Sequence, residues 1–595
     1  MRLRTSSLAL AIITLLSLVY LPVALAHGGD ETGGLQGGHN SHGEGDATGQ
    51  HEEEVDYPPT YFAHPDHVAL LYAHIALMVL AWVIALPVAV MLSLARSRYT
   101  VLSQLVFTAF NGVGVFLATI YNAETPDLYP NNAHHSIGWV ATCFALAQFV
   151  VSSLSLVAHR AVSSRTSPIT SERNLFLPLS RNIEQSQQQA YFSDYRLSDD
   201  EGQSSESARS HRSSSASTVI DDEEGLPMPS PHKDFKDEGY DDLEEQHLES
   251  AHVRGTWTKR AVSIVSSRVW SYISITYKTA DRIILPLGFI ALTTGIATAG
   301  RFFEGNAIFS GLAHWIKGGV FFWLGLFTLG RWSGCFGNLG WAWNIRPQSA
   351  SSRWWPSAEF VESALIFFYG STNVFLEHLG SWGGEWSAQD FEHLAITILF
   401  IGGGLCGMLI ESTRIRELLN AATVEAIPER TYSDEEKQAQ NEEPSTYQFS
   451  LNPIPALVIL LLGTMMSSHH QDIMIASMVH KQWGNLLVGA AFARGLTYVL
   501  IFLRPPTSTL PSRPPTELLA SFGLIAGGIV FMASSSDTIQ GMIHYELDAM
   551  FMYTVTMGIV GLLMAWEIVV LAIKGLATRS EQRLRLARLG QNNRC

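Results

Sequence analysis

The sequence predicts an all-α membrane protein that crosses the bilayer about eleven times. Hydrophobic residues make up 47% of the 595 positions, whereas charged residues make up only 15%. The apolar residues gather in runs of roughly 20, the length a helix needs to cross the hydrocarbon core. The formal net charge of -16 comes from acidic segments outside these runs. It therefore describes solvated loops and not a binding face.

The amino terminus has the pattern of a secretory signal. Basic residues, an apolar run and the small residues Ala24-Leu-Ala26 predict a signal peptide over residues 1–26. Its removal would leave the mature amino terminus in the lumen. Residues 27–63 are rich in Gly and His and should be a disordered tail, because such a composition cannot form a packed core. The tail is either simply solvated or holds Cu or Zn through its histidines, His27, His39, His42 and His51.

Three spans precede a long polar linker and eight follow it. The first three, near 67–94, 99–121 and 134–157, form a module over residues 64–158. Arginines after the first and third spans place those ends in the cytosol. The second module covers residues 281–577, with spans near 282–300, 306–330, 357–377, 391–411, 453–468, 478–503, 517–535 and 547–574. The odd number of spans leaves the basic tail, residues 578–595, in the cytosol.

Residues 159–280 form the predicted linker, which is acidic, rich in Ser and disordered. Sites such as Ser198, before an acidic cluster, suit phosphorylation and the recruitment of cytosolic proteins. The lipid bilayer is the other expected partner. The sequence shows no nucleotide-binding loop, no Ser/His/Asp arrangement with usable spacing and no basic nucleic-acid patch. Nucleic acid is therefore not an expected partner, and enzymatic activity stays open.

Histidines near the apolar runs gather at one predicted membrane surface, the lumenal one. A polar elbow, Ser467–Gly484, joins two spans there, and the ends of other spans add to it. Ionisable groups at membrane depth mark function by default. A site for Cu, Zn or Fe, structural hydrogen bonds between helices and pH sensing are the open interpretations. The candidate metal ligands are His314, Glu377, His378, His393, His469, His470 and His480.

Two charged residues lie well inside predicted spans, Arg494 in the ninth and Glu567 in the eleventh. We expect these side chains to pair, because a partner removes much of the free-energy cost of a charge in the membrane. Such a pair is either structural or part of a proton or ion pathway.

The first module contains two histidine segments, His74-Ile-Ala-Leu-Met-Val-Leu-Ala-Trp-Val-Ile-Ala-Leu-Pro87 and His134-His-Ser-Ile-Gly-Trp139. With Arg96 and Gln148 beyond them, these segments resemble part of the transmembrane cytochrome b561 group. The resemblance implies one haem b, held by His74 and His135, with His134 as the alternate ligand. The group uses four histidines for two haems, and the span over 99–121 contains none. At most one haem site is therefore expected.

Five further segments carry a second resemblance to a known family. They are Gly311–Gly325, Gly330–Cys335, Gly340–Pro347, Glu377–Gly380 and Met478–Gly484. In these the chain resembles the fungal YTP family of yeast transmembrane proteins, in which such an amino-terminal module precedes a larger membrane region. The resulting hypothesis is a multi-pass protein of the secretory pathway, plasma membrane or vacuole/endosome membrane, with a lumenal haem or metal site and a redox role. A metal-ion or proton-coupled transporter and a non-catalytic scaffold are the alternatives.

Overall fold

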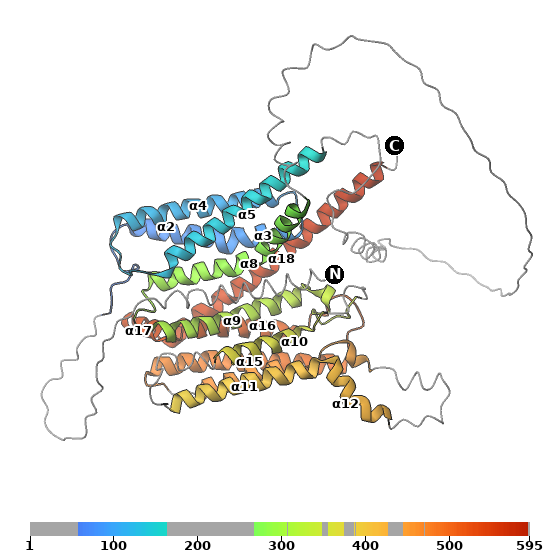
Figure 1. Cartoon of the computed structure of the whole chain (residues 1–595). Coiled ribbons are helices and arrows are strands. Elements are labelled where there is room, and N and C mark those ends of the chain that lie inside the picture. Colours follow the sequence, from blue (N-terminus) through green and yellow to red (C-terminus); the bar gives the residue numbers. More distant parts are fainter. Residues whose placement is uncertain are drawn as a thin grey trace, which may run out of the picture. The chain divides into compact units, whose positions relative to one another are not determined.

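The fold is that of a computed structural model, drawn in Figure 1. It describes residues 57–163, 267–305, 307–347, 355–373, 386, 388–425, 444–468 and 471–592, and all regular elements in these ranges are helices. The chain divides into two compact units, Met1–Leu154 with Thr276–Cys595, and Ser155–Ile275. The first unit contains the membrane helices. From the second, only the end of one helix and the start of another are described.

The first helices form a four-helix group. They are α2 (Val68–Met78), the π-helical turn η1 (Val79–Ala85) and α3 (Leu86–Leu94), which run on as one helix, α4 (Thr100–Glu124), α5 (Ala133–Ser163) and α8 (Ser267–Ala299). Trp82, Phe107, Ala141 and Ile284 pack into a single core, so α8 belongs with the first three spans although it follows the linker.

The π-helical turn η1 has a local cause. Pro87 lacks a backbone N–H, so it cannot donate to the carbonyl of Val83, four residues earlier. The indole Nε1 of Trp566 donates to that carbonyl at 2.8 Å. Trp566 lies on α18 (Ala549–Asn592), which therefore packs against the first span.

The other helices form the larger part of the unit. They are α9 (Ala307–Ser333), α10 (Ala358–Asn373), α11 (Ala388–Glu411), α12 (Thr413–Glu425), α14 (Ile454–Ser468), α15 (Met474–Leu503), α16 (Pro515–Met532), α17 (Ser536–His544) and the 3-10 turns η2 (Gly337–Leu339) and η4 (Ser445–Gln448). α9 and α16 touch through backbone, because a Cβ added at Gly318 would lie 2.5 Å from the Gly528 carbonyl oxygen. Such small-residue contacts are typical of helices that associate in lipid.

Nine of the described helices are long and apolar enough to cross a membrane. The two remaining expected spans correspond to α10, with 16 residues, and to the short apolar helix α14, with 15. The all-α membrane class is confirmed. The count of eleven and the orientation in the membrane stay predictions.

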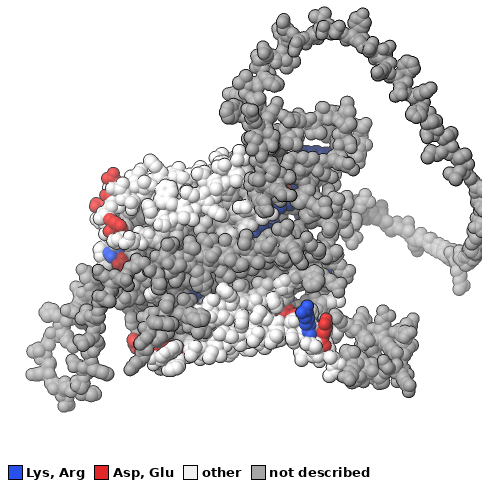
Figure 2. Space-filling view, viewed as in Figure 1, with Lys and Arg blue, Asp and Glu red and all other residues white. Residues whose placement is uncertain are grey.

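The outer surface suits lipid. Figure 2 shows a face on which the described residues are almost all uncharged over the middle, with Lys, Arg, Asp and Glu toward the ends. Large apolar side chains point outward along the helices, among them Leu102, Phe116, Phe492 and Leu562. An apolar exterior of this size is expected where acyl chains replace water as solvent.

The structure corrects the predicted ends of two disordered segments, the amino-terminal tail and the linker. Residues 57–63 pack against the unit: the Tyr61 N–H donates to the Ala299 carbonyl at 3.2 Å, and Thr60 is buried. Aromatic rings supply the apolar surface that the rest of the tail lacks. Helix α8 begins at Ser267 and not near 282, because the polar residues there do not break its helical periodicity. The signal peptide, residues 27–56 and 164–266 lie outside the described residues.

Candidate functional site

The described histidines of the predicted layer lie near helix ends that share one end of the unit. We call this the histidine end; it carries His74, His134, His314, His393, His480 and His544. Loops at this end contact one another: the Tyr129 hydroxyl donates to the Phe302 carbonyl at 2.8 Å, and the Phe303 N–H donates to Asp537 at 2.5 Å. The other candidate ligands, Glu377, His378, His469 and His470, lie outside the described residues.

His74 on α2 and His134 on α5 face each other. Their ring centres are 6.4 Å apart and the ring planes meet at 68°. His135, the first choice of ligand from the sequence, is exposed instead. Neighbouring residues on a helix point about 100° apart, so only one of the two can face α2. The structure therefore places His134, and not His135, opposite His74.

Both rings are held through Nδ1. Nδ1 of His74 lies 2.9 Å from the carbonyl oxygen of Gly114, which can only accept, so this Nδ1 carries the proton. Nδ1 of His134 lies 3.3 Å from the Thr294 hydroxyl, which donates its own proton to the Ile290 carbonyl. The Nδ1–H of His74 leaves its Nε2 with a free lone pair, as in histidines that bind metal through Nε2.

The pair suits iron or another transition metal. Imidazole nitrogen binds a metal at about 2 Å and the ring centre lies about 1 Å further, so two rings on opposite sides of one ion have centres about 6 Å apart. The observed 6.4 Å is close to that separation. In the described part of the chain no group of three or more His, Cys, Asp or Glu is arranged to hold a metal. Two histidines match haem, which brings its own equatorial nitrogens, better than a closed structural zinc site.

A second histidine pair joins α9 and α15. The rings of His314 and His480 are 5.9 Å apart and perpendicular. Each Nδ1 donates to a carbonyl one turn earlier in its own helix, Ser310 for His314 and Ala476 for His480. Phe531 packs against the His314 ring. This environment is that of interhelical packing, with His393 on α11 near enough to interact electrostatically with His314.

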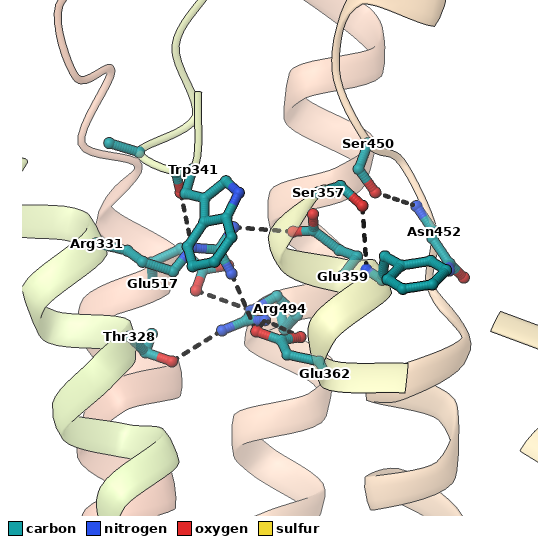
Figure 3. A network of polar contacts seen from close by, with 12 residues as sticks. Thr328, Arg331, Trp341, Ser357, Glu359, Glu362, Ser450, Asn452, Arg494 and Glu517 are labelled. Carbon is teal, nitrogen blue, oxygen red and sulfur yellow. Dashed lines mark hydrogen bonds and ion pairs between the residues drawn. The ribbon is translucent and has the colours of Figure 1, made fainter. Parts of the chain in front are cut away.

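A buried network of charges lies toward the opposite end and joins α9, α10, α15 and α16 (Figure 3). The Arg331 guanidinium donates to Glu359 at 2.8 Å and to Glu362 at 3.0 Å. Arg494 donates to Glu517 at 2.9 Å and to Glu362 at 3.3 Å. All five side chains are at most 8% exposed. Glu362 thus bridges the two arginines.

Neutral groups complete the coordination of the two guanidinium groups. The Trp341 carbonyl accepts from Arg331 at 2.7 Å, and the Thr328 hydroxyl accepts from Arg494 at 3.0 Å. The Trp343 ring lies 4.3 Å from the Arg331 guanidinium, within the range of a cation–π contact. Proteins keep arginine buried by giving the N–H donors of its planar guanidinium hydrogen-bond acceptors in this way.

The expected pair of Arg494 with Glu567 is wrong. Arg494 reaches Glu362 on α10 and Glu517 on α16 instead. Glu567 lies beside Gly330, and its Oε2 is buried without a hydrogen-bond partner among the described residues. Depth in the membrane was the only signal for the pairing, and depth does not tell which helices are neighbours.

Sequence reasoning missed most of this network. Arg331, Glu359, Glu362 and Glu517 lie near the ends of predicted spans, where charges normally mark the water interface. A usable signal was present in the segments Gly330–Cys335 and Gly340–Pro347, which join arginine and tryptophan just beyond a span.

Comparison with known proteins gives the family. Residues 287–575 match the family described as Protein YTP1-like, C-terminal, and residues 55–158 match a domain of unknown function, DUF2427. The Schizosaccharomyces pombe protein named uncharacterized membrane protein C3B8.06 is 31% identical over 546 residues, 89% of this chain and 98% of the relative. The Saccharomyces cerevisiae uncharacterized membrane protein YCR061W is 42% identical over 47% of this chain and 45% of its own length.

Saccharomyces cerevisiae protein YTP1 is 25% identical over 182 residues, 30% of this chain and 31% of that protein. No solved structure matches the chain. The match to the fission-yeast protein runs through both modules and almost the whole length of that relative. The chain therefore belongs to the Ytp1-like family of membrane proteins.

Proposed function

We propose that this protein holds one haem b, or a single transition-metal ion, between His74 and His134 and transfers electrons at one membrane surface. The observation that carries the proposal is the facing pair of imidazoles with both Nδ1 atoms engaged. The likeness of the two histidine segments to the cytochrome b561 group supports haem as the occupant. The bound iron would supply one-electron chemistry.

The protein's own residues orient the ligands. Gly114 on α4 and Thr294 on α8 hold the two rings through Nδ1. Outside the pair, the Trp82 indole donates to Asn111 at 2.9 Å, and the Asn111 amide donates to the Thr142 hydroxyl at 3.2 Å. These bonds tie η1, α4 and α5 together. Fixed outer partners of this kind are what tune a metal-binding histidine.

The proposed site serves one surface only. Helix α4 contains no histidine, so a second pair at the other end of the four-helix group is not available from it. An electron would then enter and leave at the histidine end. By the sequence topology this end faces the lumen of the secretory pathway, or the outside at the plasma membrane.

The test is an optical spectrum of the full chain purified in detergent, oxidised and then reduced with dithionite, with elemental analysis of the same sample. We expect a Soret band and sharp reduced bands, or one bound metal ion per chain. His74→Ala and His134→Ala should each abolish the signal. His135→Ala is the matched control and should keep it, because that ring is exposed. A wild-type protein with neither haem nor metal would overturn the proposal.

A metal-ion or proton-coupled transporter is the second candidate function. It is favoured by Glu567, whose Oε2 is buried within a membrane helix without a hydrogen-bond partner among the described residues. Uptake of zinc or copper ions, or of protons, into proteoliposomes tests it, with Glu567→Gln as the variant. Absence of flux at every pH would exclude this candidate and leave the redox proposal untouched.

A further inference from the structure

A third polar site lies in the four-helix group, at the end opposite to the histidines. Asp281 on α8 is the only carboxylate that the described residues contribute to it, and it is 3% exposed. The last turn of α3, the first turns of α4 and the second half of α5 surround it. Each of these helices contributes one or two neutral polar side chains, which are Ser93, Gln104, Gln148, Ser152 and, on α8 itself, Tyr277.

Two side chains donate directly to the carboxylate. The Ser93 hydroxyl lies 2.6 Å from Asp281 Oδ2, and the Gln148 amide donates to Oδ1. The Tyr277 hydroxyl lies one step further away, 3.0 Å from Ser93 and 2.8 Å from Ser152. The three hydroxyl groups therefore form an unbroken chain that ends on Asp281.

The direction of this chain follows from counting protons. Ser93 gives its only hydroxyl proton to Asp281, so it must accept from Tyr277. Tyr277 has then used its own proton and accepts from the Ser152 hydroxyl and from the Gln104 amide, which lies 3.1 Å away. Every donor points toward the carboxylate.

Within the described ranges no ion pair to Asp281 occurs, and its neighbour Arg282 donates instead to the Lys278 carbonyl at 2.7 Å. Of the groups that face Asp281 from α3, α4 and α5, none is ionisable. On α8 itself, Tyr277 is ionisable and Arg282 is the nearest charge. In a membrane helix, a carboxylate without a cation partner is neutralised most simply by a proton.

A small cavity lies beside the site. Gln104 and Gln148 line it together with Phe107 and Ile284, and its volume of about 10 Å³ is close to what one water needs. Gln104 is 6% exposed, and its Oε1 is buried with no hydrogen-bond partner in the part of the chain that the structure describes. An amide oxygen left unpaired at the wall of such a cavity indicates a place for a water that can exchange protons.

We propose that Asp281 is a proton-binding site and that Ser152, Tyr277 and Ser93 relay protons to it. A proton that reaches the Ser152 oxygen releases the Ser152 proton to Tyr277, the Tyr277 proton moves to Ser93, and the Ser93 proton moves to Oδ2 of Asp281. The carboxylate becomes a neutral acid and the three hydroxyl groups reverse their orientation. The reverse sequence releases the proton. No covalent bond other than O–H changes, and no co-reactant is required.

The test is infrared difference spectroscopy of the full chain in lipid nanodiscs, with carbon-13 in the aspartate carboxyl groups. Lowering the pH should produce the carbonyl band of a protonated, labelled carboxyl group. Asp281→Asn should remove this band. Glu124→Gln is the matched control, because Glu124 is an exposed carboxylate at the end of α4, and it should leave the band unchanged.

The relay is tested separately by Tyr277→Phe, which keeps the ring and removes the hydroxyl. The acid band should persist in this variant, while its exchange into deuterium oxide slows on the order of tenfold or more. Exchange at the wild-type rate would overturn the relay. This variant and the labelled wild type keep the test decisive if Asp281→Asn does not fold.

Two further outcomes would overturn the proton site. The first is a wild-type spectrum without any pH-dependent band that depends on Asp281. The second is a band that disappears when sodium chloride replaces choline chloride at constant pH, which would identify a sodium site. Haem binding is read in the visible spectrum and this band in the infrared, so the two proposals can fail independently.

Discussion

The two buried polar sites away from the histidine end both stabilise carboxylates inside the protein, but they do so with different partners. The network of Arg331 and Arg494 holds its carboxylates with guanidinium forks. Asp281 is held by hydroxyl and amide groups alone. A guanidinium has five donors in a fixed plane and no acceptor, whereas a hydroxyl can donate or accept. The first site is therefore locked in one arrangement, and the second can reverse its hydrogen bonds.

The locked site has the larger consequence when one member is removed. Desolvation of each charge costs several kcal/mol, and only the complete set of partners offsets this cost. The reversible site contains one charge and can lose it to a proton. We therefore expect a structural role for the arginine network and a titrating role for Asp281.

The largest effect is expected for Arg494→Met. This change leaves Glu517 and part of Glu362 without a cation in the protein interior, so we expect a loss of about 3–5 kcal/mol of stability. Thermal unfolding in detergent, followed by tryptophan fluorescence, measures it. Arg504→Met is the control, because Arg504 is an exposed arginine at the end of the same helix. Equal unfolding temperatures for the two variants would show that the network adds no stability.

The next effect concerns the packing that holds the locked site in place. At Gly528 an added Cβ would lie 2.5 Å from the Phe322 nitrogen and 2.6 Å from the Gly318 oxygen. Gly528→Ala should therefore push α16 away from α9 and lower stability by about 1–3 kcal/mol. At Gly561 on α18 nothing lies within 4 Å of the added Cβ, so Gly561→Ala should have no such effect. Similar unfolding curves for both variants would contradict this account.

Asp281→Asn should cost less, about 1 kcal/mol, because it replaces charge-assisted hydrogen bonds by neutral ones. The Asn amide can donate to Ser93, and the hydroxyl chain can turn to accept this. Chemical denaturation of the purified variant beside the wild type measures the cost. A loss as large as that of Arg494→Met would mean that Asp281 is locked in one charge state, and the comparison between the two sites would fail.

The membrane spans could be predicted from the sequence because an apolar run of about 20 residues has few other uses. The partners of buried charges could not, because they depend on which helices are neighbours. Arg494 was recognised as a buried charge. Its partners Glu362 and Glu517 lie on other helices, and the depth of a residue in a predicted span does not show which helices are its neighbours.

The same limit applies at the histidine site, where the sequence could not decide which of two adjacent histidines faces His74. The resemblance to the cytochrome b561 group implied His135 as the partner of His74, with His134 as the alternate. The rotation of α5 against α2 and α8 decides between them, and this rotation depends on packing with α8, which follows a long linker in the chain. No local pattern contains that information. Asp281 was missed for a related reason, because α8 was expected to begin after it.

The smallest effect is expected for a partly exposed ion pair at the histidine end, which completes the comparison. Arg301 and Glu304 are 2.8 Å apart in the loop between α8 and α9, with side chains 16% and 37% exposed. The hydrogen bond that Arg301 donates to Glu304 raises the pKa of Arg301, so its guanidinium stays charged at physiological pH. Water competes for both groups, so Glu304→Gln should cost below about 1 kcal/mol, and less at high salt. If this variant, measured by thermal unfolding at low and high salt, lost as much stability as Arg494→Met, then burial would not be what distinguishes the locked network.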